Sequence, residues 1–144
     1  MTMRRDNIIK FLETWGLIIF AFLMFLLTVV ICNSQTVDQV KLELKKYDID
    51  DDHVDIIVAQ SVLETGWYES LWCKNFDNIF GLTTKVSGVR IAQVFSDWRY
   101  SVRSYYNQIY RKYKGGDYYA FLKNLPYAMD PEYIDKLKKI KDKI

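Results

Sequence analysis

Histidine and cysteine are scarce in this chain, and their scarcity disfavours several kinds of catalytic site. There is one histidine, His53, and there are two cysteines, Cys32 and Cys73. Cys32 ends a long apolar run while Cys73 lies in a later segment, so the pair does not make a disulfide framework. A thiol hydrolase would place a histidine beside its cysteine, and His53 follows an acidic run without such a signature. One histidine among scattered acids gives no metal-ligand spacing, so we expect no metal and no cofactor.

A strong net charge is also missing. Twenty Lys and Arg against 18 Asp and Glu give a formal charge of +2, which does not by itself indicate nucleic acid. Basic and aromatic residues do alternate between Trp98 and Lys114, a pattern that nucleic-acid binders share. Packing of the aromatics under a basic outer face explains it more simply, and the topology below places this segment outside the cell. We expect no nucleic-acid partner.

One segment has no charged residue at all. It runs from residue 15 to residue 32 and is about 18 residues long, which is just enough for a helix to span a bilayer. Arg4, Arg5 and Lys10 precede it, and the positive-inside rule then places the N-terminus in the cytoplasm. We therefore predict a single-pass protein of the cell membrane, with the rest of the chain periplasmic or extracytoplasmic.

These signals divide the chain into four parts. Residues 1–14 are the cytoplasmic N-terminus and residues 15–34 a transmembrane signal anchor; the alternative is a signal peptide cleaved after Ser34, which would release a secreted protein. Residues 35–52 are either a stalk or the first helix of the domain, and residues 53–144 form the domain itself.

The periodicity of the exported part predicts a mainly α (α+β) domain. Helical spacing is expected over residues 54–63, over 98–113, over 118–122 and after Asp130. Residues 68–82 are expected to form a short helix followed by a turn, and the only credible strand pair surrounds Ser87 and Gly88. Gly66 is placed to end the first of these helices, and Gly115 with Gly116 to end the long one.

Glu64 is the first candidate for a catalytic group. It lies at the end of an apolar helical segment, just before Gly66 and Trp67. The negative end of the helix dipole and the neighbouring aromatic rings both disfavour ionisation, so the pKa of this carboxyl should be raised. A raised pKa suits a general acid that works near neutral pH. An ordinary surface glutamate in a last helical turn is the competing interpretation.

Three blocks of sequence carry a resemblance to a known family. They are residues 59–67 (AQSVLETGW), 78–82 (NIFGL) and 127–133 (YAMDPEY). They resemble, in order and spacing, the AQSALESGW, NLFGI and YATDPxY blocks of the glucosaminidase family of bacterial peptidoglycan hydrolases, which includes autolysins and flagellar muramidase-type domains. The resemblance extends from about residue 53 to residue 140 and implies a lysozyme-like helical domain with one small β-hairpin.

The resemblance also implies roles for particular residues. Glu64 matches the catalytic acid of the family, and Tyr127 matches a tyrosine that lines the active site, where its hydroxyl would bind substrate or position water. Further residues are expected to shape or contact the groove: Gln60, Ser61, Trp67, Asn78 and Phe80. The implied partner is the glycan strand of peptidoglycan, and the implied enzyme is a β-N-acetylglucosaminidase-like glycoside hydrolase that cleaves β-1,4 bonds.

The chain departs from the family pattern at one important place. Glycoside hydrolysis commonly needs a second carboxylate, and the family supplies it from the small β-lobe, yet residues 78–96 contain no Asp or Glu. Asp77, Glu69 and Asp97 flank that region. The alternatives are therefore a lytic transglycosylase that uses Glu64 alone, or a non-catalytic cell-wall-binding module.

Overall fold

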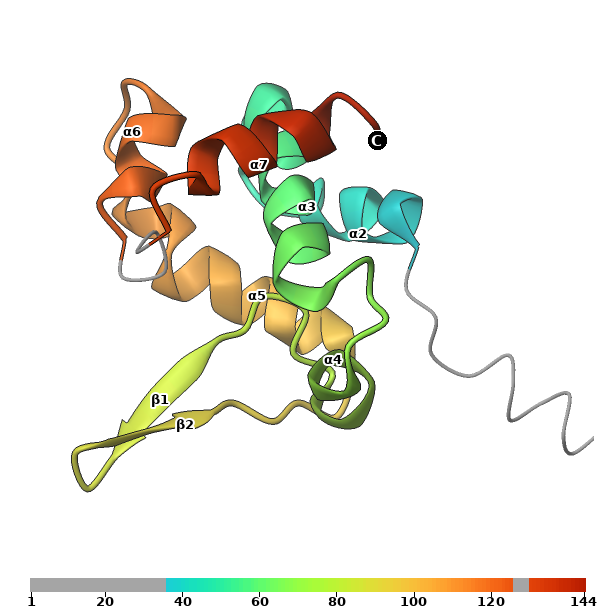
Figure 1. Ribbon diagram of the computed structural model, residues 1–144, viewed down its shortest axis with the longest axis vertical. Coiled ribbons are helices and arrows are strands. Elements are labelled where there is room, and N and C mark those ends of the chain that lie inside the picture. Colours follow the sequence, from blue (N-terminus) through green and yellow to red (C-terminus); the bar gives the residue numbers. More distant parts are fainter. Residues whose placement is uncertain (1–35, 126–129) are drawn as a thin grey trace, which may run out of the picture. The chain divides into compact units, whose positions relative to one another are not determined.

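The computed structural model describes residues 36–125 and 130–144 (Figure 1). These residues form short helices around one longer helix, with a single two-stranded sheet. The elements, in chain order, are α2 (Val37–Leu44), α3 (Asp51–Thr65), α4 (Leu71–Phe76), β1 (Thr83–Val86), β2 (Val89–Ala92), α5 (Trp98–Gln108), the 3-10 turn η1 (Tyr110–Lys112), α6 (Tyr118–Lys123) and α7 (Tyr133–Lys141). A mainly helical domain with one small hairpin is thereby confirmed.

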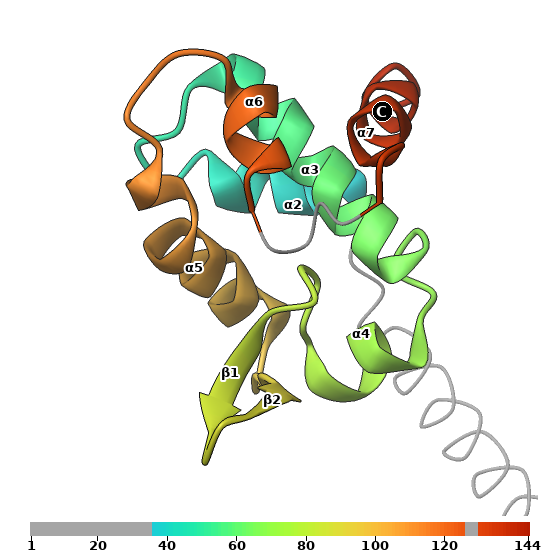
Figure 2. The ribbon, with the colours of Figure 1, turned by 60° about the vertical axis from the view of Figure 1, so that its left-hand side comes forward.

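Helix α3 is the centre of the domain. Asp50 caps its start, since Oδ1 accepts a hydrogen bond from the Asp52 N–H at 3.0 Å, and acidic residues occupy the first turn as the helix dipole favours. From Val54 to Val62 every side chain is buried except that of Asp55, so this helix is covered on nearly all sides. Helices α2 and α7 pack directly against it (Figures 1 and 2). A residue at the end of α3 is therefore held by the whole core.

Helix α2 is part of that core. A capping box begins it, with Thr36 Oγ1 accepting from the Gln39 N–H at 3.2 Å and Gln39 Oε1 accepting from the Thr36 N–H at 3.0 Å. Val40 and Leu44 are fully buried in the cluster that also contains the α3 side chains. Of the two interpretations of residues 35–52, the packing favours a first helix over a stalk.

The hairpin formed by β1 and β2 projects away from the helices (Figures 1 and 2). Its strands pair antiparallel, from Thr83 opposite Ala92 to Val86 opposite Val89, and Ser87 with Gly88 make a turn with positive φ at both residues. Every β1 residue is exposed, and so is all of β2 except Ala92. The apolar residues of these two strands therefore do not face a core, although the apolar pattern around Ser87 and Gly88 predicted the hairpin.

Two predicted helix ends differ from the structure. Helix α5 stops at Gln108, and a 3-10 turn replaces the expected continuation toward Gly115. Helix α7 begins at Tyr133, because Asp130 Oδ1 caps a turn that precedes the helix by accepting from the Glu132 N–H at 2.9 Å. Within residues 36–125 and 130–144, no helix is long and apolar enough to cross a membrane; the predicted signal anchor at 15–34 lies outside the described residues.

Candidate active site

Glu64 is the next-to-last residue of α3, at a helix end of specific geometry. Gly66 takes the left-handed conformation with φ of 57°, and its N–H bonds back to the Val62 carbonyl, as predicted for a glycine cap. Unusually, the left-handed stretch continues through Trp67 and Tyr68, with φ of 62° and 64°. Side chains normally avoid this region, so the turn needs other interactions to hold it.

Hydrogen bonds from α3 hold this left-handed turn in place. The Tyr68 N–H donates to Thr65 Oγ1 at 2.9 Å, and the Tyr68 hydroxyl lies 2.8 Å from Ser61 Oγ. Ser61 is fully buried, so it supports the turn from inside rather than touching a ligand. The turn leaves Trp67, three residues after Glu64 in sequence, 48% exposed, but Trp67 is not among the residues that line the groove beside Glu64.

A groove of about 390 Å³ opens beside Glu64. It lies between the end of α3, helix α4 and the base of the hairpin, and its lining residues are Glu64, Ser70, Trp72, Asn78, Gly81, Thr83, Arg90 and Ala92. Gly81 lies close to the carboxyl group: a Cβ built there would lie 3.3 Å from Glu64 Oε2. Gly81 also has a φ of 60°, so both the close approach and the backbone conformation favour glycine.

Asn78 fixes the loop that carries Gly81. Its Oδ1 accepts from the Leu82 N–H at 2.9 Å, and its Nδ2 donates to the carbonyls of Leu82 and Gln93 at 2.8 and 3.0 Å. The side chain is almost fully buried, and these three bonds join the loop to the strand that leaves the hairpin. Asn78 lines the groove and holds the backbone around it.

A chain of hydrogen bonds leads from the core to Glu64. The Tyr105 hydroxyl lies 3.0 Å from that of Tyr118 and donates to Gln60 Oε1; Gln60 Nε2 donates to the Tyr133 hydroxyl at 3.1 Å. The Tyr133 hydroxyl in turn donates to Glu64 Oε1 at 3.4 Å, a long hydrogen bond. Gln60 is buried and does not reach the groove, so it acts on Glu64 through Tyr133.

The pKa of Glu64 is raised. Desolvation by the surrounding protein is the main cause, and the hydrogen bond from Tyr133 acts in the opposite direction because it stabilises the carboxylate. The residue nevertheless keeps access to solvent through the groove. The carboxyl group can thus hold a proton above its usual pH range while remaining reachable by a ligand, as a general acid must.

No second carboxylate lines the groove in the part of the chain that the structure describes. Glu69 is exposed and paired with Lys74 at 2.7 Å, and Asp97 caps α5 while binding Arg99 at 2.8 Å. Asp77 has a raised pKa, because it is partly desolvated and lies near Asp97, but it too is absent from the lining. Among the described residues no group of His, Cys, Asp and Glu could hold a metal ion.

The remaining predicted site residues lie in different places. Phe80 is buried and stacks on Tyr105 with ring centroids 4.3 Å apart, so it supports the groove from the core instead of binding substrate. Tyr127 lies outside the described residues. Sequence reasoning missed Gly81, Tyr133, Trp72 and Arg90. The first two belong to the second and third blocks of the resemblance, where a signal was available, whereas Trp72 and Arg90 gave none.

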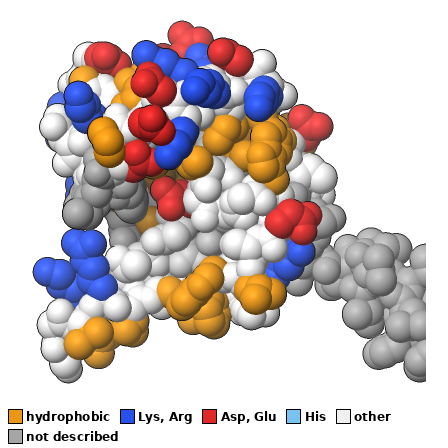
Figure 3. All heavy atoms as spheres, viewed as in Figure 1, with side chains coloured by type: hydrophobic (Ala, Val, Ile, Leu, Met, Phe, Trp, Pro, Cys, Tyr) orange, Lys and Arg blue, Asp and Glu red, His pale blue; other side chains and the backbone are white. Residues whose placement is uncertain are grey.

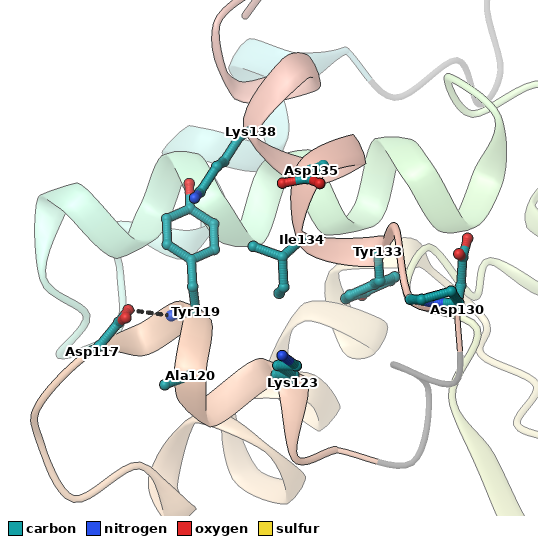
Figure 4. Close-up of a pocket in the computed structure, with 10 residues that line it drawn as sticks. Asp117, Tyr119, Ala120, Lys123, Asp130, Tyr133, Ile134, Asp135 and Lys138 are labelled. Carbon is teal, nitrogen blue, oxygen red and sulfur yellow. Dashed lines mark hydrogen bonds between the residues drawn. The ribbon is translucent and has the colours of Figure 1, made fainter.

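A second pocket of similar volume, about 400 Å³, lies between α6 and α7 (Figure 4). Tyr119 lies beneath Lys138, whose Nζ is 5.3 Å from the ring centroid, and Asp130 lies at the opposite end. Lys136 bonds to Asp130 at 2.6 Å and lowers the pKa of that carboxyl. An acid held ionised cannot be the proton donor near neutral pH, so the Glu64 groove remains the candidate site.

A comparison with models of protein families identifies the family of this chain. The Glucosaminidase family model, described as mannosyl-glycoprotein endo-beta-N-acetylglucosaminidase, matches residues 37–144. Curated proteins and solved structures gave no match. The matched region includes every described helix and strand, and with it the whole groove around Glu64. The chain therefore belongs to the Glucosaminidase family, and that membership suggests glycoside hydrolase activity on peptidoglycan.

Proposed function

We propose that this protein is a membrane-anchored peptidoglycan hydrolase of lysozyme-like fold that cleaves β-1,4 bonds next to N-acetylglucosamine, with Glu64 as the general acid. The observation that carries the proposal is that Glu64, whose pKa is raised, lines a groove together with the aromatic side chain of Trp72. Trp72 lines that groove and is 63% exposed, which suits stacking on a sugar ring.

In the proposed reaction Glu64 gives its proton to the glycosidic oxygen as the bond to C1 breaks. Because no carboxylate among the described groove residues can attack C1, the carbonyl oxygen of the substrate's own 2-acetamido group does so and closes a five-membered ring. Water then opens that ring. The ionised Glu64 takes a proton from this water and returns to its starting state.

The reaction product distinguishes this substrate-assisted hydrolysis from lytic transglycosylation, which also needs only one carboxylate. A lytic transglycosylase would use the C6 hydroxyl of the same sugar as the attacking group and would release an anhydro end. The full chain in mild detergent is incubated with purified sacculi, and the fragments are identified by mass spectrometry. Reducing ends support the hydrolase, anhydro ends support the transglycosylase, and binding without any release of fragments supports a non-catalytic wall-binding module.

A substitution at Glu64 tests the catalytic assignment directly. Glu64→Gln keeps the size of the side chain but cannot donate a carboxyl proton, so we expect turnover to fall at least about a hundredfold. Glu69→Gln is the matched control, because Glu69 is exposed and paired with Lys74 away from the groove lining. Retained activity in Glu64→Gln, with native circular dichroism, would remove Glu64 from the mechanism.

We also propose that residues 15–34 anchor the enzyme in the cell membrane with the domain on the outer side. The support is the uncharged run preceded by basic residues. If the anchor is retained, the full chain stays with membranes after carbonate extraction and the domain is digested by protease only from the outer side. A soluble product beginning near residue 35 would instead show cleavage.

A further inference from the structure

Two basic side chains face each other across the hairpin. Lys85 and Arg90 are direct partners in the antiparallel register, and both are exposed. Like charges at directly opposite positions destabilise a strand pair. Neither side chain forms an ion pair with any residue in 36–125 or 130–144, whereas Lys41, Lys74 and Arg99 each lie next to an acid. Nothing in the described domain offsets this repulsion.

A third cation joins them from another element. Lys112, in the 3-10 turn η1, lines the same hollow of about 250 Å³ as Lys85 and Arg90. Thr83 and Thr84 also line the hollow, and none of its lining residues is acidic. Figure 3 shows Lys and Arg side chains gathered over the hairpin with no Asp or Glu among them. Three cations from two separate segments thus converge on one hollow.

This hollow adjoins the Glu64 groove, because Thr83 and Arg90 line both. A glycan strand that occupies the groove and continues past these two residues would bring its substituents to the hollow. A group bound by the three cations would therefore belong to the same polymer as the sugar at Glu64.

We propose that Lys85, Arg90 and Lys112 form a binding site for anionic oxygen groups, carboxylate or phosphate, attached to the glycan that the groove holds. The site rests on the proposed function for the identity of the polymer. An oxyanion placed there offsets the repulsion between Lys85 and Arg90 and accepts hydrogen bonds from three cations and the nearby threonines. Because the side chains are exposed, binding weakens as salt rises.

Binding is measured separately from catalysis. The starting protein is the full chain with Glu64→Gln, kept in mild detergent. Lys85→Gln/Arg90→Gln is added to it, and binding of both proteins to insoluble sacculi is titrated. We expect the double variant to bind about tenfold more weakly than the Glu64→Gln protein, with a shallower dependence on salt. The matched control is Lys139→Gln/Lys143→Gln, which removes the same charge from exposed positions near the C-terminus. Equal loss in both double variants, or no loss in either, would overturn the proposal.

Two treatments of the wall identify the source of the anion. Removing phosphate polymers with hydrofluoric acid abolishes the difference between the double variants if the ligand is a phosphodiester, and converting the carboxylates of the wall to neutral amides with a carbodiimide and methylamine abolishes it if the ligand is a carboxylate. A difference that survives on walls treated in both ways would show that the site does not bind anions. Turnover of the protein with the native Glu64 is assayed in parallel. If it shows no turnover but the binding difference is clear, the proposed hydrolase function is rejected and the anion site is kept.

Discussion

At the scale of single residues, the proposed role of Glu64 as a general acid imposes two opposed demands. Its carboxyl group needs enough contact with protein to raise its pKa, yet it must stay open to substrate. Gly81 and Tyr133 divide these tasks. Gly81 lets the loop backbone come close to Oε2 without covering it, and Tyr133 holds Oε1 by a hydrogen bond that limits the rise of the pKa.

The Tyr133 hydroxyl can be removed without changing the ring. In Tyr133→Phe the carboxylate of Glu64 loses a donor, so the pKa of Glu64 should rise further, and the alkaline limb of the kcat/KM profile should move to higher pH. Gln60 Nε2 also loses its hydrogen bond to the Tyr133 hydroxyl, at a cost of about 1–3 kcal/mol in the free energy of unfolding. A pH–rate profile and a denaturant titration measure the two effects. A limb that stays in place would show that the long bond does not influence Glu64.

Gly81 offers a test of the close approach. Gly81→Ala places a Cβ 3.3 Å from Glu64 Oε2, closer than ordinary van der Waals contact, and adds roughly 1–2 kcal/mol of left-handed strain. Gly116→Ala is the control, because Gly116 also has positive φ but nothing lies within 4 Å of a Cβ built on it. We expect both variants to lose some stability and only Gly81→Ala to lose activity. Equal activity loss would mean that strain, not crowding of the carboxyl group, is responsible.

At the scale of elements, the groove depends on how the hairpin joins the helices. The strands themselves contribute no buried apolar face, so their position is set at the base, where Asn78 binds both the loop and the outgoing strand. Asn78 therefore helps to set where Gly81 and Arg90 lie relative to Glu64, together with Gln93, whose side chain bonds to the Thr83 carbonyl and to Gln108.

Loss of that side chain should affect the fold and the site together. Asn78→Ala removes three hydrogen bonds in a buried position and should lower the free energy of unfolding by about 2–4 kcal/mol. Asn124→Ala is the control, since Asn124 makes one exposed bond to the Ala120 carbonyl and should cost less than about 1 kcal/mol. Chemical denaturation compares the two, and a similar cost in both would contradict the anchoring role.

The sequence predicted elements well where a local rule was sufficient. Apolar spacing with an acidic start and a glycine stop located α3, and the Ser87–Gly88 turn located the hairpin. It did not predict that Gln60 and Ser61 would be buried, because helical spacing shows which residues share a face but not which neighbours cover it. Nor did it show that Tyr133 reaches Glu64, since 69 residues separate them and only packing of α7 on α3 joins them.

At the scale of the whole molecule, the hydrophobic core begins in α2, before the acidic residues at 48–52. The side chains of Val40 and Leu44 are fully buried, and each contributes roughly 1.5–3 kcal/mol by leaving water. A domain of this size has a total stability of only about 5–15 kcal/mol. Helix α2 thus supplies a share of stability that the domain cannot easily lose.

Two truncations test this. A fragment that begins at Thr36 retains α2 and should fold cooperatively, while a fragment that begins at His53 lacks it and should unfold at a much lower temperature or fail to fold. Circular dichroism with thermal melting distinguishes them. Equal melting temperatures would show that residues 36–52 are dispensable for the core.

The left-handed turn after α3 has a consequence for the balance between robustness and activity. Glycine would adopt the φ of 62° at position 67 without the steric penalty that tryptophan bears, and the indole there is only half buried, so little packing compensates for that penalty. Selection for a durable fold alone would favour the smaller residue. Trp67 is then a place where the protein is less stable than its backbone allows. Under the proposed function, replacing it with glycine should stabilise the turn and weaken binding to the glycan.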